Sequence, residues 1–172
     1  DPQSIIDDPY PLGGSPLWNY TKTIWENIFG ECQLWEQRWF ENIVWTNLYK
    51  IAPHNGGNPS NKIMKMQLEA CAELLKKEIE YFNPTHILFL TGRDWANPFI
   101  SLFDNVRLRK ANHSRGENKN EIYVEGTALY NTLKGGKCRV VIACRPEFRD
   151  KDKFTTQVTE YLTEKKNIED YE

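Results

Sequence analysis

The chain has 172 residues, of which 40% are hydrophobic and 13% aromatic. This composition excludes disorder over the whole length, and the length fits one domain. The apolar runs are too short to cross a bilayer and no charged-then-apolar leader opens the sequence, so we expect a cytoplasmic protein without a membrane span. The net charge is −2, but residues 103–153 hold 12 basic and seven acidic side chains, a bias that suits a polyanionic partner.

The cysteines and histidines form no local metal-binding motif. Cys32, Cys71, Cys138 and Cys144 are spaced 39, 67 and 6 residues apart and include no C-x-x-C pair, and the three histidines are scattered. We therefore expect reduced, mostly buried thiols and no metal site or cofactor.

The first half of the chain predicts an arm, two long helices and one strand. Residues 1–16, rich in Asp, Pro and Gly, read as an N-terminal arm before a single α/β domain over 17–172. Ser15-Pro16 starts a helix that ends near Gly30, and residues 33–42 suggest a further helical turn. The β-branched and aromatic run 43–49 predicts a buried strand. Ser60 caps the clearest helix, whose apolar stripe runs from Met64 to Phe82.

The second half continues the alternation of strands and helices. Strands are predicted over 87–91, 122–124 and 138–144, and helices over 95–103 and 151–167, with a long loop or ragged hairpin over 104–120. This order favours a three-layer α/β/α fold around a central, mostly parallel, four-stranded sheet. Ligands of such sheets bind beyond the carboxyl ends of the strands. We therefore expect the chemistry in the segments 47–59, 92–94 and 145–150.

Two of these segments carry residues suited to recognition. The amide of Asn47 either bonds the backbone in a structural role or faces a ligand edge, since it offers one acceptor and two donors. Lys50 and His54 follow in a loop suited to phosphate contact. Arg145, held by Pro146, is either a surface cation or a charge aimed into the cleft, where it would stabilise developing negative charge.

The order of several motifs resembles the uracil-DNA glycosylase superfamily. The motifs are Thr46-Asn47 with Lys50, Gly57-Asn58-Pro59, the long helix with Gln67 and Cys71, and a strand that ends at Gly92. Cys144-Arg145-Pro146-Glu147 falls where the family has His-Pro-Ser. The resemblance covers residues 43–95 best and 138–150 more weakly.

This resemblance implies base excision in DNA repair, in which a hydrolase flips a base out of DNA and hydrolyses its N-glycosidic bond. Arg145 would take the place of the catalytic histidine. The implied substrate-binding residues are Asn47, Lys50, His54, Asn58, Gly92 and Pro146.

The sequence also departs from the family. The family's first motif, which positions the water, cannot be placed: Asp7-Asp8-Pro9-Tyr10 invites comparison with its Asp-Pro-Tyr, but the strand before it and the connection after it are shorter than the family needs. The iron–sulfur cysteines of the most similar branch are absent. The alternative is a non-catalytic module that keeps the fold and binds a nucleotide, a nucleic acid or a protein. An unrelated α/β enzyme for a small metabolite is a third possibility, although no phosphate-binding glycine motif or nucleophile motif supports it.

Overall fold

The computed structural model describes residues 15–30, 39–108, 122–133 and 135–166. Its longer helices are α2 (Pro16–Phe29), α3 (Asn61–Phe82) and α5 (Lys151–Leu162), and its shorter ones are η1 (Trp39–Asn42), α4 (Arg93–Ala96) and η2 (Asn97–Leu102). The strands are β1 (His86–Leu90), β2 (Asp104–Leu108), β3 (Val124–Asn131) and β4 (Lys137–Ala143). The predicted arm over 1–16 lies almost wholly outside the described residues.

The four strands form one mixed sheet in the order β1-β4-β3-β2. β1 pairs with β4 in parallel, whereas β3 is antiparallel to both β4 and β2. The predicted four-stranded sheet is therefore present, but the prediction that it is mostly parallel is wrong. The connection between the end of β3 at Asn131 and the start of β4 at Lys137 is short, and Thr132 N–H donates across it to Gly136 O at 2.9 Å. A connection this short can join only antiparallel strands.

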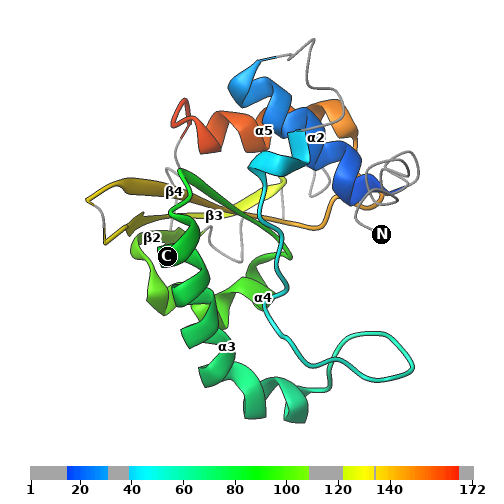
Figure 1. Cartoon of the computed structure of the whole chain (residues 1–172). Helices are drawn as coiled ribbons and strands as arrows, with labels where there is room; N and C mark the ends of the chain where they lie inside the picture. The colour runs from blue at the N-terminus through cyan, green and yellow to red at the C-terminus, as the bar shows by residue number, and fades with distance from the viewer. Residues whose placement is uncertain (1–14, 31–38, 109–121, 134, 167–172) are drawn as a thin grey trace, which may run out of the picture.

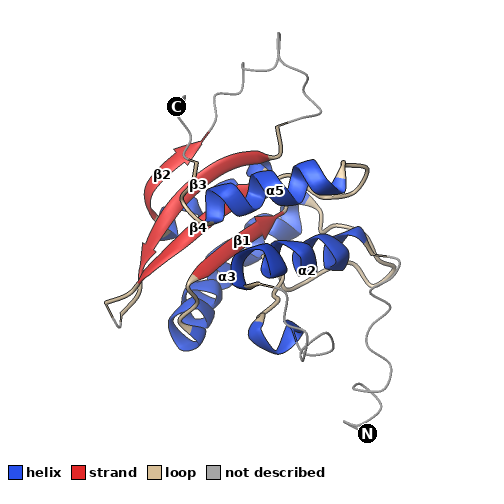
Figure 2. Ribbon diagram, turned by 90° about the horizontal axis from the view of Figure 1, so that it is seen from above, coloured by secondary structure: helices blue, strands red, loops and turns tan. Residues whose placement is uncertain are grey.

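Helices pack against both faces of the sheet (Figures 1 and 2). Alternate residues of β4 point to opposite faces, so this strand is buried on both sides. On one face, Cys138, Val140 and Ile142 of β4 share a core with α3 and η2. On the other, Val141 and Ala143 share a core with α2 and α5. The general α/β class predicted from the sequence is thus confirmed.

Helix α3 follows its predicted pattern closely. Ser60 caps it by accepting a hydrogen bond from Ile63 N–H at 3.4 Å, and Asn83 ends it in the left-handed conformation, with φ of 47°. Cys71, Leu75 and Ile79, at helical spacing, are buried. This helix therefore has one apolar stripe against the sheet, while its other sides stay free to meet neighbouring loops.

The predicted strand over 43–49 is not a strand. This segment is irregular, and the side chains of Val44 and Trp45 are 53% and 59% exposed. Polar side chains of α3 hold part of this stretch: Glu78 accepts from the Thr46 hydroxyl, and Gln67 bonds the backbone just after the stretch. The β-branched and aromatic composition predicted a strand, but strand formation needs a neighbouring strand as well as suitable residues.

Other boundaries differ more modestly. The predicted helix over 95–103 is α4 followed by η2. Of the strand predicted over 122–124, only Val124 lies in β3, which continues to Asn131. In the predicted loop or ragged hairpin, residues 104–108 form β2, which pairs antiparallel with β3, whereas residues 109–121 lie outside the described ranges. In the helical turn predicted over 33–42, residues 39–42 form η1, and residues 33–38 lie outside the described ranges. Across the described ranges, no helix combines the length and apolar character needed to cross a membrane.

Gly126 in β3 offers a test of the sheet packing. A Cβ at this position would lie 2.7 Å from Leu108 Cδ2 and 3.1 Å from Ile142 Cδ1. We expect Gly126→Ala to lower the free energy of unfolding by about 1–3 kcal/mol through overpacking. Urea denaturation of this variant measures the loss.

A second background isolates the cause of that loss. In a Leu108→Ala protein, the closest contact is gone, so Gly126→Ala should cost at least about 0.5 kcal/mol less than in the wild type. Equal costs in the two backgrounds would show that crowding by Leu108 is not responsible.

Candidate functional site

The carboxyl ends of β1 and β4 lie at the same edge of the sheet, because the two strands are parallel and in register. Gly92 follows β1 and donates its N–H to the carbonyl of Ala143, the last residue of β4, at 2.8 Å. Gly92 has a φ of +79°, a conformation that favours glycine. Two of the three predicted segments, 92–94 and 145–150, therefore begin side by side.

Aromatic and cation–π contacts connect the segment 47–59 to the segments that follow β1 and β4. The guanidinium carbon of Arg145 lies 5.9 Å from the ring centroid of Trp95, in cation–π geometry. Trp95 packs edge-on against Tyr49, with centroids 5.6 Å apart. Tyr49 stands two residues after Asn47, so the structure brings the start of segment 47–59 to the same edge. Burial raises the pKa of the Tyr49 hydroxyl, with a smaller effect from Cys71.

Arg145 begins a short turn with a buried base and an exposed tip. Arg145 itself is exposed, whereas Pro146 is fully buried beneath it. Arg149 N–H donates to Pro146 O at 3.2 Å, and the Tyr20 hydroxyl of α2 donates to Arg149 O at 2.6 Å. At the tip, Phe148 is fully exposed and has a φ of 62°, which is uncommon for a residue with a side chain. The turn is thus anchored from below and presents an aromatic ring to solvent.

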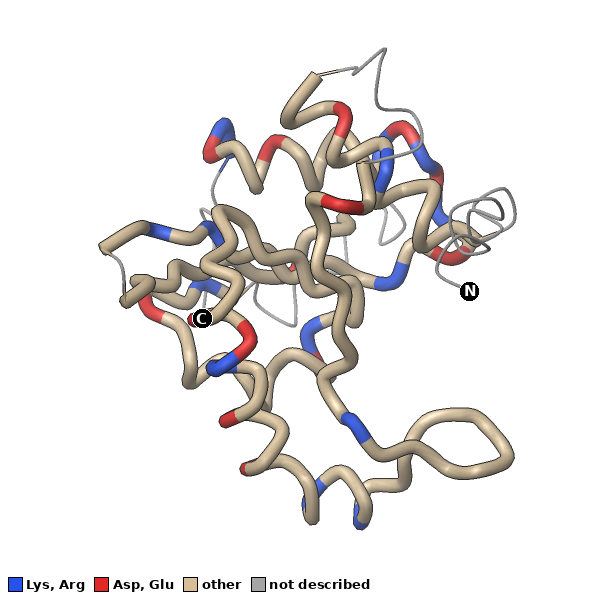
Figure 3. Tube along the Cα trace, viewed as in Figure 1, with Lys and Arg blue, Asp and Glu red and all other residues tan. Residues whose placement is uncertain are grey.

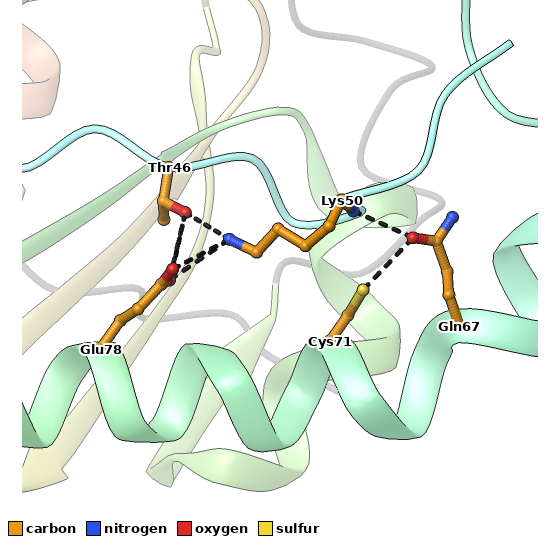
Figure 4. Close-up of polar contacts among 5 residues, drawn as sticks. All are labelled: Thr46, Lys50, Gln67, Cys71 and Glu78. Carbon is orange, nitrogen blue, oxygen red and sulfur yellow. Dashed lines mark hydrogen bonds and ion pairs between the residues drawn. The ribbon is translucent and has the colours of Figure 1, made fainter.

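Lys50 is engaged by α3 instead of standing free in its loop. Its ammonium lies 3.1 Å from Glu78 Oε1 and also donates to the Thr46 hydroxyl, which in turn donates to Glu78 Oε2 at 3.1 Å (Figure 4). Phosphate contact by Lys50 would have to compete with this ion pair. Its role as a substrate-binding residue stays a prediction.

Gln67 fixes the backbone next to Lys50. Its side-chain oxygen accepts the N–H groups of Lys50 and Ile51, both at 2.9 Å, and its amide donates to Ile51 O at 3.0 Å. The side chain is buried, and Cys71 Sγ also donates to its oxygen, at 3.4 Å (Figure 4). In the sequence, Gln67 stands out only through the resemblance, yet its one amide binds the backbone of two residues where the chain leaves the site edge.

The other predicted residues are solvent-exposed. Asn47 is exposed, and its amide forms no hydrogen bond with the described part of the chain, so the ligand-facing interpretation stays a prediction. His54 and Asn58 are exposed on a loop that projects from the body of the molecule in Figure 1, with Gly56 N–H bonded to Pro53 O at 3.1 Å. No contact in the described residues joins this loop to Arg145.

The described charged residues do not gather into a basic face (Figure 3). Lys, Arg, Asp and Glu are interspersed along the described chain (Figure 3), and the 109–121 stretch, with four of the basic side chains, lies outside it. A basic face therefore stays a prediction.

Cys71, Cys138 and Cys144 are free and buried, as predicted, and burial raises the pKa of Cys138 to about 12. In the described ranges, no three His, Cys, Asp or Glu side chains gather as metal ligands.

Comparison with known proteins gives no relative. The chain matches no protein-family model, no curated protein and no solved structure. The interpretation of the site therefore depends on its residues and on their geometry.

The Gln67 contacts generate a stability prediction. Gln67→Ala leaves two N–H groups and one carbonyl without their partner, so we expect the free energy of unfolding to fall by about 2 kcal/mol. Proteolytic cleavage within 51–59 should also become faster. Met66→Ala, one position earlier and 77% exposed, is the control and should leave both unchanged. Equal unfolding midpoints for the two variants would refute the role of Gln67.

Proposed function

We propose that this protein is a uracil-DNA glycosylase-like enzyme that removes a damaged or deaminated base from DNA by hydrolysis of the N-glycosidic bond. The observation that carries the proposal is the convergence of Tyr49, Trp95 and Arg145 at one edge of the sheet. Arg145 follows the strand that the resemblance aligns with the family's catalytic strand. The three-layer fold of that family is part of the same proposal.

Arg145 suits the stabilisation of a departing base. A base that leaves with the electron pair of the glycosidic bond is an anion, and a guanidinium is charged at every physiological pH. Arg145 is exposed, so a ligand can reach it, and Trp95 supports it from one side. A planar base fits such a site because aromatic rings and guanidinium planes both stack on bases.

Phe148 suits the opening of a duplex. Proteins that deform DNA insert apolar side chains between base steps, and an inserted side chain must be exposed and firmly held. Phe148 is fully exposed on a turn that is anchored through Pro146 and Tyr20. This arrangement supports contact with stacked DNA next to Arg145.

One observation favours the alternative, a binding module without catalysis. Lys50 is neutralised by Glu78, so the loop cation that the resemblance assigns to the substrate is already paired. An excision assay separates the two functions, because a binding module would retain DNA without forming abasic sites.

The assay uses single-stranded and duplex oligonucleotides with one uracil, followed by alkaline cleavage of abasic sites. We expect excision by the wild type and a loss of about 100-fold for Arg145→Ala, the size typical of losing one charge-stabilising donor. Lys137→Ala removes an exposed cation at the other end of β4 and should retain full activity. DNA binding without excision by the wild type would favour the binding module.

Phe148→Ala tests the contact with stacked DNA. The variant should excise uracil from the single strand at the wild-type rate but from the duplex at least about 10-fold more slowly, since only the duplex must be unstacked. Leu133→Ala, which removes another exposed apolar side chain in the β3–β4 turn, is the control. Equal loss on both substrates would contradict a role in duplex opening.

A further inference from the structure

Glu125 lies at the same edge of the sheet, although no motif singles it out. In the pairing of β3 with β4, Val124 is opposite Ala143 and Gly126 is opposite Ile142, so Glu125 is the extra residue of a β-bulge. Bulges often redirect a side chain next to an active site. Because β3 runs antiparallel to β4, its first residues lie beside the last residues of β4. Arg145 follows two residues after β4 ends at Ala143.

The Glu125 carboxylate is held through one oxygen. Oε2 accepts the N–H of Arg93 at 2.6 Å, and a Cβ at Gly92 would lie only 3.5 Å from the same atom. Within the described part of the chain, its hydrogen bonding goes through Oε2, and Oε1 keeps its lone pairs. Glu125 is half-buried, so its carboxylate is fixed in place but still within reach of water.

The same short helix connects Glu125 to Arg145. Arg93 begins α4, and Trp95, two residues later, supports the guanidinium. The Glu125 carboxylate is also near Cys144, the residue before Arg145. Burial raises the pKa of this thiol most, the Arg149 charge opposes the rise, and Glu125 adds a smaller contribution to it. A carboxylate and a guanidinium thus each contact α4, the first through the Arg93 N–H and the second through the Trp95 ring.

We propose that Glu125 is the general base that activates water in the excision reaction. This inference rests on the proposed function and assigns the water-activating role to a described residue, since the family's motif for that role could not be placed in the sequence. Oε1 takes a proton from a water molecule while the water oxygen bonds C1′ of the deoxyribose. The bond from C1′ to the base nitrogen breaks, and its electron pair leaves with the base, whose negative charge Arg145 stabilises. The proton then passes from Glu125 to the base, so the products are a free base and an abasic sugar.

Glu125→Gln separates the charge from the structural contact. The glutamine has the same size, and its side-chain oxygen still accepts the Arg93 N–H, but it does not take a proton from water. We expect single-turnover excision of uracil from the single-stranded oligonucleotide to fall about 100-fold or more. DNA affinity and the urea midpoint should equal those of the wild type. Glu69→Gln, which removes an exposed carboxylate on α3, should excise normally.

Each outcome decides between the inference and its alternatives. Excision by Glu125→Gln within about threefold of the wild type overturns the base assignment and leaves the proposed function intact. A loss of excision that is matched by a loss of DNA affinity or of stability also overturns it, since Glu125 would then only hold the 91–95 segment. Absence of excision by the wild type, with DNA binding retained, overturns the proposed function and this inference together.

Discussion

The parallel pairing of β1 with β4 is the constraint on which the candidate site depends. It places the ends of both strands at one edge, and the hydrogen bond from Gly92 N–H to Ala143 O joins the two segments that leave them. β4 is buried on both faces, so neither strand can shift without disturbing two cores at once. A one-residue slip would exchange the two faces of the strand and would also move Arg145 away from Trp95. The position of the exposed guanidinium is therefore set by packing inside the molecule.

Helix α3 contributes differently, through polar side chains on the flank of its apolar stripe. Gln67 and Glu78 are three turns apart along the helix, and both bind the stretch 46–51. Backbone groups that leave water need hydrogen-bond partners, and here the Gln67 amide provides them where no strand ladder does, while Glu78 bonds the side chains of Thr46 and Lys50. This arrangement holds Tyr49 against Trp95 and Phe99 while Asn47 stays exposed. The irregular stretch is thus ordered at the point where it meets the site.

Much of the fold can be predicted from the sequence because its strongest signals are local. The apolar spacing and the Ser60 cap of α3 predict the helix that is found, and the continuous apolar runs of β1 and β4 predict buried strands. Strand direction is not local. The Gly135-Gly136 pair between two apolar runs indicates a hairpin, and that signal competes with the alternation of strands and helices that suggested parallel pairing. The run at 43–49 has strand composition, but composition does not provide a neighbouring strand.

The residues of the candidate site also divide into those that local sequence signals predict and those that depend on distant parts of the chain. The strand-end rule finds the segments that hold Gly92 and Arg145, because it depends only on where strands end. The rule does not find Trp95, because the position of its ring under the guanidinium follows from the direction of the four-residue helix α4. It also does not find Glu125, because a β-bulge sets the direction of that side chain. A bulge depends on the register between two strands, and register involves residues that are far apart in the chain. Glu125, the charged residue at this bulge, reaches the α4 backbone at the site edge. The Glu125 carboxylate, from β3, and the Arg145 guanidinium, which follows β4, therefore both contact the short helix α4. This shared contact brings an acidic and a basic side chain to the same edge of the sheet.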